Sequence, residues 1–116
     1  MEPLLEQLQS QGADISGSLV RFMQNEGLYV RCLKKFPAEA EKNAYMDDIH
    51  NKNWEDAIHK THTLKGLTGN LGLTALYARY TELVRRLRSD EFAGIDEYAA
   101  ETEQLQKSVC ATIDAS

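Results

Sequence analysis

Four residues near the middle of the chain have types and spacings that could support chemistry: His62, Lys65, Gly66 and Gly69. In a helix that turns by about 100° per residue, Gly66 and Gly69 lie about 40° and 20° to either side of His62. Lys65 lies about 60° from the same position. The imidazole is therefore bordered by positions that carry either no side chain or a long cationic one, and we expect it to be uncovered.

These residue types suit the transfer of a phosphoryl group. An imidazole exposed to water is mostly neutral near pH 7 and can attack phosphorus through a ring nitrogen. Lys65, one turn further along, can reach the oxygens of the transferred group and stabilise the transition state. A glycine inside a helix costs about 0.5–1 kcal/mol relative to alanine. We therefore expect Gly66 and Gly69 to allow the close approach of a partner macromolecule.

Two short runs of residues resemble the active-site helix of histidine-containing phosphotransfer (HPt) domains: His62-x-Leu64-Lys65-Gly66 and Gly69-x-Leu71-Gly72. The resemblance covers about residues 14–115, and its specific part is confined to residues 62–72. It implies a four-helix bundle, usually with an extra N-terminal helix, that relays phosphoryl groups between the aspartates of receiver domains. It also implies that His62 is the phosphorylated residue and that Lys65 and Gly66 support it.

The resemblance further implies the partners, which are the receiver domains of response regulators and of a hybrid sensor histidine kinase in a two-component phosphorelay. The chain has no G-x-x-x-x-G-K-[ST] run or other glycine-rich nucleotide loop, so we expect a carrier without kinase activity of its own. No carboxylate cluster adjoins His62 in the sequence, so we expect no cofactor in this chain. The Mg²⁺ ion and the acceptor aspartate are expected in the receiver partner.

Other interpretations of the same residues stay open. A helical adaptor could bind receiver domains through this face without carrying phosphate, and a kinase active site could phosphorylate His62 directly. His59 and His62 are one turn apart, but two ligands without a third are weak grounds for a metal site. Phe22 and Met23 are either core residues or an apolar rim for receiver docking, if their helix lies beside His62.

The histidine lies in a predicted helix that runs from about Trp54 to Leu71. Its opposite side is a core-facing stripe of Ala57, Thr61, Leu64, Thr68 and Leu71. Asn53, with Asp56 three residues later, is expected to cap the start of this helix. Gly72 suits its end, and Thr74 is expected to cap the following helix.

Helical periodicity extends over nearly the whole chain and predicts an all-α fold. Two short helices are expected first, one beginning at Pro3 and one capped by Asp14. Pro37 predicts a kink or a break around Phe36. The last helix is expected to begin at Ile95, after a turn over residues 89–94. Four long helices with short connections favour an antiparallel four-helix bundle with short extra N-terminal helices, formed by residues 1–116 as a single domain.

Composition limits the classes of partner. The 116 residues carry 13 basic and 18 acidic side chains, and the net charge of −5 argues against nucleic-acid binding. The arginines of the 74–88 region, Arg79, Arg85, Arg86 and Arg88, are expected to form a solvated helix face. No apolar run is long enough to span a membrane and no signal peptide is recognisable, so we expect a cytoplasmic monomer that does not bind membranes.

Overall fold

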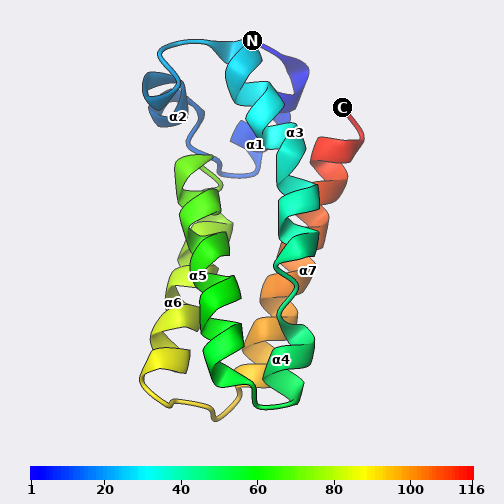
Figure 1. Ribbon diagram of the computed structural model, residues 1–116. Coiled ribbons are helices and arrows are strands. Elements are labelled where there is room, and N and C mark those ends of the chain that lie inside the picture. Colours follow the sequence, from blue (N-terminus) through cyan, green and yellow to red (C-terminus); the bar gives the residue numbers. More distant parts are fainter.

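The computed structural model describes all residues from 1 to 116, and it confirms the predicted all-helical class (Figure 1). The helices are α1 (Pro3–Ser10), α2 (Ile15–Arg21), α3 (Glu26–Lys42), α4 (Met46–His50), α5 (Trp54–Asn70), α6 (Thr74–Arg88) and α7 (Ile95–Asp114). No strand is present. None of the helices combines the length and the apolar composition that a membrane span requires.

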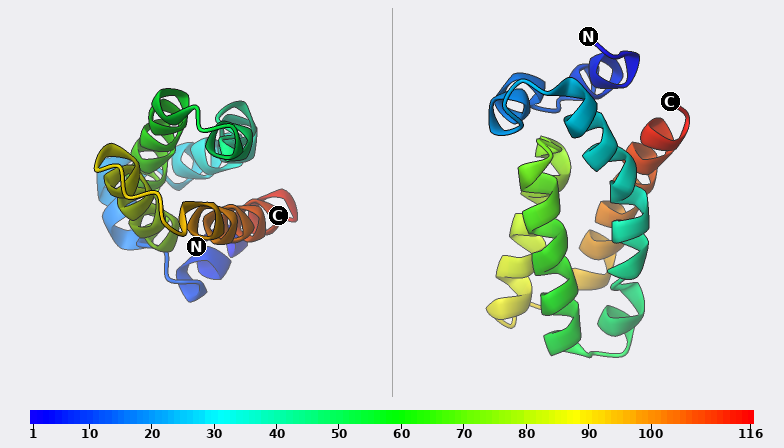
Figure 2. Two further views of the ribbon diagram at one scale, coloured as in Figure 1. Left: turned by 90° about the horizontal axis from the view of Figure 1, so that it is seen from below. Right: turned by 45° about the horizontal axis from the view of Figure 1, so that its top comes forward.

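The long helices run side by side and alternate in direction along the chain. α5 packs along α6, α6 packs on α7, and α7 packs on α3, while α4 contacts both α5 and α7 (Figure 1). Seen along the long axis, α3, α5, α6 and α7 surround a common centre (Figure 2). The short helices α1 and α2 lie at one end of the molecule, where both chain termini are also found (Figure 1). This arrangement leaves one side of α5 open to solvent.

The core-facing stripe predicted for α5 is confirmed. Its members Ala57, Thr61, Leu64, Thr68 and Leu71 are all buried. The hydroxyl groups of Thr61 and Thr68 donate hydrogen bonds to the carbonyl oxygens one turn earlier, at 2.7 and 2.8 Å, so neither hydroxyl is left unpaired in the core. Burial of this stripe fixes the rotation of α5 about its own axis. The side chains on the opposite face must therefore point outward.

Two of the predicted helix ends are confirmed. The Asp14 carboxylate accepts a hydrogen bond from the backbone N–H of Gly17 at 3.0 Å and so caps α2. Gly72 ends the α5 segment with a φ of +71°, a left-handed conformation that glycine adopts without strain.

The predicted cap of α5 is the right residue without a capping hydrogen bond, and the predicted cap of α6 is wrong. Asn53 stands at the N-terminal cap of α5, but its side chain makes no capping hydrogen bond, so the expected pairing with Asp56 is not formed. Thr74 is the first residue of α6 rather than its cap, which is Leu73. Leu73 takes this position because its side chain is buried in the core, and burial outweighs the preference for a polar cap.

Of the two outcomes expected at Pro37, a kink or a break, the break is ruled out, because α3 continues through this residue to Lys42. The chain leaves the helix at Asn43, whose side-chain amide donates to the carbonyl oxygen of Glu39 at 2.9 Å. The same carbonyl oxygen also accepts the backbone N–H of Asn43 at 3.2 Å, so the two bonds together close the last turn of α3. Phe36 and Ala40 on either side of Pro37 are both buried, so core packing holds the helix together across the proline.

The N-terminal segment is joined to the C-terminal end of α5 by hydrogen bonds. The last carbonyl oxygens of a helix lack the regular donors four residues later, and at the end of α5 those of residues 69–72 also accept bonds from the N-terminal segment. The guanidinium of Arg21 donates to the oxygens of Gly69 and Asn70. The phenol of Tyr29 donates to the oxygen of Leu71 at 2.6 Å. The backbone N–H of Asp14 donates to the oxygen of Gly72 at 2.9 Å. These bonds place α2 at the end of the histidine-bearing helix.

An ion pair joins α4 to α5 and leads to a testable prediction. The Lys60 ammonium lies 2.6 Å from a carboxylate oxygen of Asp48, whose side chain is only 12% exposed. The hydrogen bond to Asp48 raises the pKa of Lys60, so the stabilising contribution is complete below about pH 10.5 and is lost as the pH rises through the raised value. We expect Lys60→Met to lower the free energy of unfolding by about 1 kcal/mol at pH 7.

Urea denaturation of the wild type and of Lys60→Met at several pH values measures this difference. It should shrink above pH 10.5, where the wild-type ammonium loses its charge. A difference that stays constant up to pH 12 would contradict an ionic contribution. Lys42→Met is a suitable control, because Lys42 is 71% exposed and its only ion pair is with a neighbour on the same helix.

Candidate functional site

His62 lies on the open side of α5, near the middle of the helix. Its side chain is exposed, as the helical phase predicts, and it makes no hydrogen bond or ion pair within the chain. The neighbouring residues Thr61 and Leu64 are buried in the core, so the backbone that carries the imidazole is firmly held. The ring nitrogens are therefore available to a reagent or a partner that approaches from solvent.

Lys65 follows His62 by one turn and supplies a cation on the same side of the helix. Its side chain is partly exposed and takes part in none of the ion pairs of the structure. Residues three apart on a helix are neighbours, with their β-carbons about 5–6 Å apart. The ammonium can therefore turn toward a group bound on the imidazole without breaking an existing contact.

The two glycines of this face have different surroundings. A β-carbon added at Gly66 would meet nothing within 4 Å, so this position is open to solvent. A β-carbon added at Gly69 would lie 2.9 Å from two ring atoms of Tyr77, which comes from α6. The missing side chain of Gly69 makes room for the Tyr77 ring, which is a packing role that the sequence did not indicate, and its expected role in partner access stays a prediction. Only Gly66 keeps open space beside His62.

This difference predicts opposite effects of the same substitution. We expect Gly66→Ala to raise the free energy of unfolding by about 0.5–1 kcal/mol, because alanine loses less backbone entropy in a helix and the space is free. We expect Gly69→Ala to be less stable than Gly66→Ala by about 1 kcal/mol, because the Tyr77 ring must move. Thermal or urea unfolding measures both variants. Equal stabilities would contradict the packing role of Gly69.

A shallow surface groove extends from His62 toward the start of α5 and reaches across to α6. It is lined by Glu55, Asp56, Ile58, His59, His62 and Arg88. All the α5 members other than His62 precede it in the sequence, while Lys65 and Gly66 follow it. No three histidine, cysteine, aspartate or glutamate side chains are grouped so that they could hold a metal ion. The groove thus contains one basic residue of α6, Arg88, together with His62.

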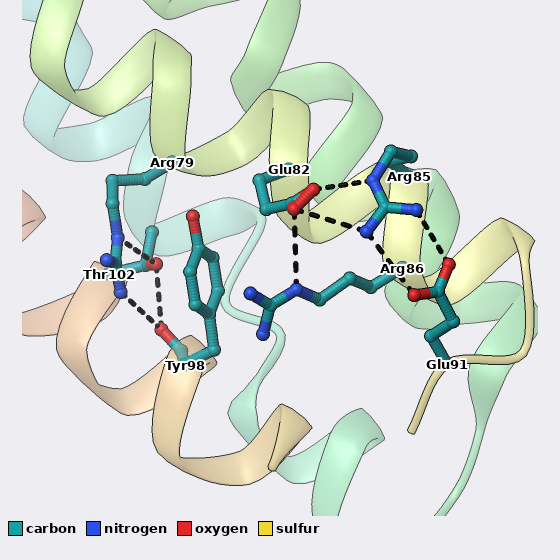
Figure 3. Close-up of polar contacts among 7 residues, drawn as sticks. All are labelled: Arg79, Glu82, Arg85, Arg86, Glu91, Tyr98 and Thr102. Atoms are coloured by element: carbon teal, nitrogen blue, oxygen red, sulfur yellow. Dashed lines mark hydrogen bonds and ion pairs between the residues drawn. The ribbon is translucent and has the colours of Figure 1, made fainter. Parts of the chain in front are cut away.

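The arginines of α6 are not the uniformly solvated face that the sequence suggested. Arg79 and Arg86 lie over the ring of Tyr98 from α7, at 3.8 and 4.1 Å from its centroid, so that the ring is held between two guanidinium groups (Figure 3). Arg85 binds the carboxylates of Glu82 and Glu91 (Figure 3). Cation–π contacts of this kind join α6 to α7. Arg88 takes part in none of these contacts.

The apolar residues near the end of α2 divide into a core member and a surface member. Phe22 is partly buried, with its ring 5.1 Å from the ring of Tyr29. Met23 is 88% exposed and has a φ of +54°, and Val20 is 67% exposed. Because α2 lies beyond the C-terminal end of α5, these side chains are displaced along the molecule from His62 (Figure 1). Both exposed side chains belong to the α2 region, at the end of the molecule where α5 terminates (Figure 1).

Three residues near the site were not identified from the sequence. Tyr77 covers Gly69, Arg21 binds the carbonyl oxygens at the end of α5, and Arg88 shares the groove with His62. Each reaches the site from another helix, so no spacing within residues 62–72 could reveal it. A scan against protein-family models and searches of curated proteins and of solved structures found no match to the chain.

Proposed function

We propose that this chain is a phosphoryl carrier, in which His62 accepts a phosphoryl group from the aspartyl phosphate of one receiver domain and passes it to the aspartate of another. The observation that carries the proposal is the exposed imidazole of His62, which makes no contact that would block its ring nitrogens. The unpaired cation of Lys65 and the open position at Gly66, both within about one turn, support it.

The proposed step is a displacement at phosphorus. The lone pair of a ring nitrogen of neutral His62 forms the new N–P bond as the bond between phosphorus and the aspartate oxygen breaks. The aspartate leaves as a carboxylate with the electron pair of that bond. The product is a phosphoimidazolium that keeps the proton of the other ring nitrogen, and passage to a second receiver reverses these events.

Lys65 supports this step by electrostatics. The transferred group carries negative charge on three oxygens, and a cation within reach stabilises the loose transition state. The receiver is expected to bring Mg²⁺ to the other side of the phosphoryl group, since the groove beside His62 holds a histidine and two carboxylates rather than a built metal site. Close approach of the two proteins requires space beside the imidazole, which Gly66 leaves free.

The proposal also gives an interpretation of the fold. We interpret α5, α6, α7 and the α3–α4 segment as the antiparallel four-helix bundle of an HPt domain, with α1 and α2 as its additional N-terminal helices. Short connections, such as residues 71–73 between α5 and α6, support this interpretation. The exposed Met23 and Val20 then lie where a receiver domain that covers His62 would extend along α5.

The decisive experiment measures transfer of radiolabelled phosphate to this chain from a panel of phosphorylated receiver domains of the same organism. The chain should gain label within minutes from at least one receiver and return it to another, without added ATP. Binding to receivers without any transfer of label would replace the proposal by a noncatalytic adaptor. Label gained only from a kinase in the absence of receivers would identify a kinase substrate instead.

Lys65→Ala tests the role of the cation. We expect transfer from a phosphoreceiver to slow by about tenfold or more, because a charge that stabilises the transition state is lost. The fold should be unaffected, since the Lys65 ammonium makes no ion pair or hydrogen bond within the chain. Single-turnover transfer assays measure the rate. Lys65→Arg should retain most of it, and an unchanged rate for Lys65→Ala would remove Lys65 from the proposed step.

A further inference from the structure

Arg88 shares a surface groove with His62 because α6 packs against α5. The two helices run in opposite directions, so the last turn of α6, which contains Arg88, lies beside the first turns of α5 (Figure 1). Arg88 is exposed and lines the groove that leads to His62. An arginine side chain places its guanidinium at the end of a flexible three-carbon chain, and the planar fork of donors on that group suits a phosphate.

The other arginines of α6 are all occupied. Arg79 donates to Thr102 and to the backbone oxygen of Tyr98 (Figure 3). Figure 3 also shows Arg85 between Glu82 and Glu91, and Arg86 paired with Glu82. Arg88 forms no ion pair or side-chain hydrogen bond, so its guanidinium is the one on α6 that can bind a new anion without losing a present partner.

We propose that Arg88 is a second positioning residue for the phosphoryl group on His62, an inference that rests on the proposed function of that histidine. Lys65 follows His62 along α5, whereas the groove that contains Arg88 extends in the opposite direction, toward residues 55–59. The two cations therefore approach the imidazole from opposite sides. Together they hold the oxygens of the phosphoryl group and limit its rotation about the N–P bond.

The charges of the groove make this second cation necessary. Glu55 and Asp56 line the same groove, and neither forms an ion pair with Arg88. A phosphoryl dianion on His62 would face these two carboxylates with only Lys65 to offset the repulsion. The attraction between two opposite charges grows with the magnitude of each charge. A phosphoryl dianion is therefore a stronger ligand for Arg88 than either carboxylate, which carries a single charge.

The test uses phosphoramidate, a small donor that phosphorylates histidine without a receiver. A ring nitrogen of His62 attacks phosphorus, the P–N bond of the donor breaks, and ammonia leaves with the electron pair. Site-resolved mass spectrometry follows the initial rate at His62, with His50 on α4 as an internal reference outside the groove. We expect Arg88→Gln to lower the rate at His62 about three- to fivefold and to leave the rate at His50 unchanged.

Two control variants separate a role in positioning from a role in stability. Arg85→Gln removes a charge from the same helix whose guanidinium is already bound by two glutamates, and it should leave the rate at His62 unchanged. Arg88→Lys keeps the charge and should restore at least half of the wild-type rate. Raising the salt concentration to about 1 M should abolish the difference between wild type and Arg88→Gln, because exposed charges are then screened beyond about 3 Å.

An unchanged rate in Arg88→Gln, or equal losses in Arg85→Gln and Arg88→Gln, would overturn the assignment of Arg88. A failure of this assignment can be distinguished from a failure of the proposed function, because the reaction of His62 with phosphoramidate does not involve a receiver. If His62 reacts with phosphoramidate in an Arg88-dependent way but gains no label from any receiver, the carrier function fails and the role of Arg88 stands. If receivers label His62 equally in wild type and Arg88→Gln, the carrier function stands and the role of Arg88 fails.

Discussion

We expect His62→Gln to lose all phosphoryl label when it is incubated with a phosphorylated receiver domain that labels the wild type. Glutamine matches the polarity of histidine and approximates its reach, but the lone pair of its amide nitrogen is delocalised into the carbonyl group and cannot attack phosphorus. The fold should be unaffected, because the His62 side chain is exposed and makes no hydrogen bond within the chain. Transfer of radiolabel, with acid lability of the product as the mark of a phosphoramidate, measures the effect.

His59→Gln is the matched control for this loss. His59 is exposed, precedes His62 by one turn and lines the same groove, so the two substitutions change the same chemical group in nearly the same place. His59→Gln should keep the wild-type level of label. Label that persists in His62→Gln and disappears in His59→Gln would move the acceptor to His59, and label that persists in both would end the proposal for this face.

Gly72→Ala should cause the largest loss of stability among single substitutions in the site region, about 2–4 kcal/mol. Gly72 has a φ of +71°, which is strained for alanine. An added β-carbon would also overlap the hydroxyl oxygen of Ser18 and lie 2.6 Å from the backbone oxygen of Asp14. Ser18 is fully buried, and Asp14 is bonded to Gly72 through its backbone, so neither can move without loosening α2 from the end of α5.

Gly94→Ala separates the two causes of this loss. Gly94 has a φ of +72°, within a degree of that of Gly72, but a β-carbon there would meet nothing within 4 Å. It should therefore show only the backbone strain, about 1 kcal/mol. Urea unfolding followed by the fluorescence of Trp54, the single tryptophan, compares both variants. Equal losses would mean that the contact between α2 and Gly72 contributes nothing to stability.

The sequence alone predicted most of what lies within one helix. The extent of α5, its buried stripe and the exposed position of His62 all follow from the 3.6-residue period, which relates residues close along the chain. The cap of α2 by Asp14 and the left-handed Gly72 were predicted for the same reason, since each depends on a few consecutive residues. The interpretation of His62 as a phosphoryl acceptor remains a proposal.

The predictions that failed depended on neighbours in space. Pro37 was expected to kink or break its helix, and the break does not occur, because the burial of Phe36 and Ala40 on either side holds α3 together across it. The contact between Gly69 and the Tyr77 ring of α6 was not foreseen either, because it joins two helices. The arginines of α6 were expected to be solvated, but Tyr98 of α7 lies between two of them.

The residues of one helix therefore determined which side of α5 faces water and placed His62, Lys65 and Gly66 together on it. Only the packing of the helices decided what else reaches that side: Tyr77 over one glycine, Arg21 at the helix end, and Arg88 in the groove beside the imidazole. The physical reason is that helical periodicity fixes directions around a single axis. The neighbours of a surface side chain depend on how the axes of two helices lie relative to each other. Burial of the whole core determines that placement.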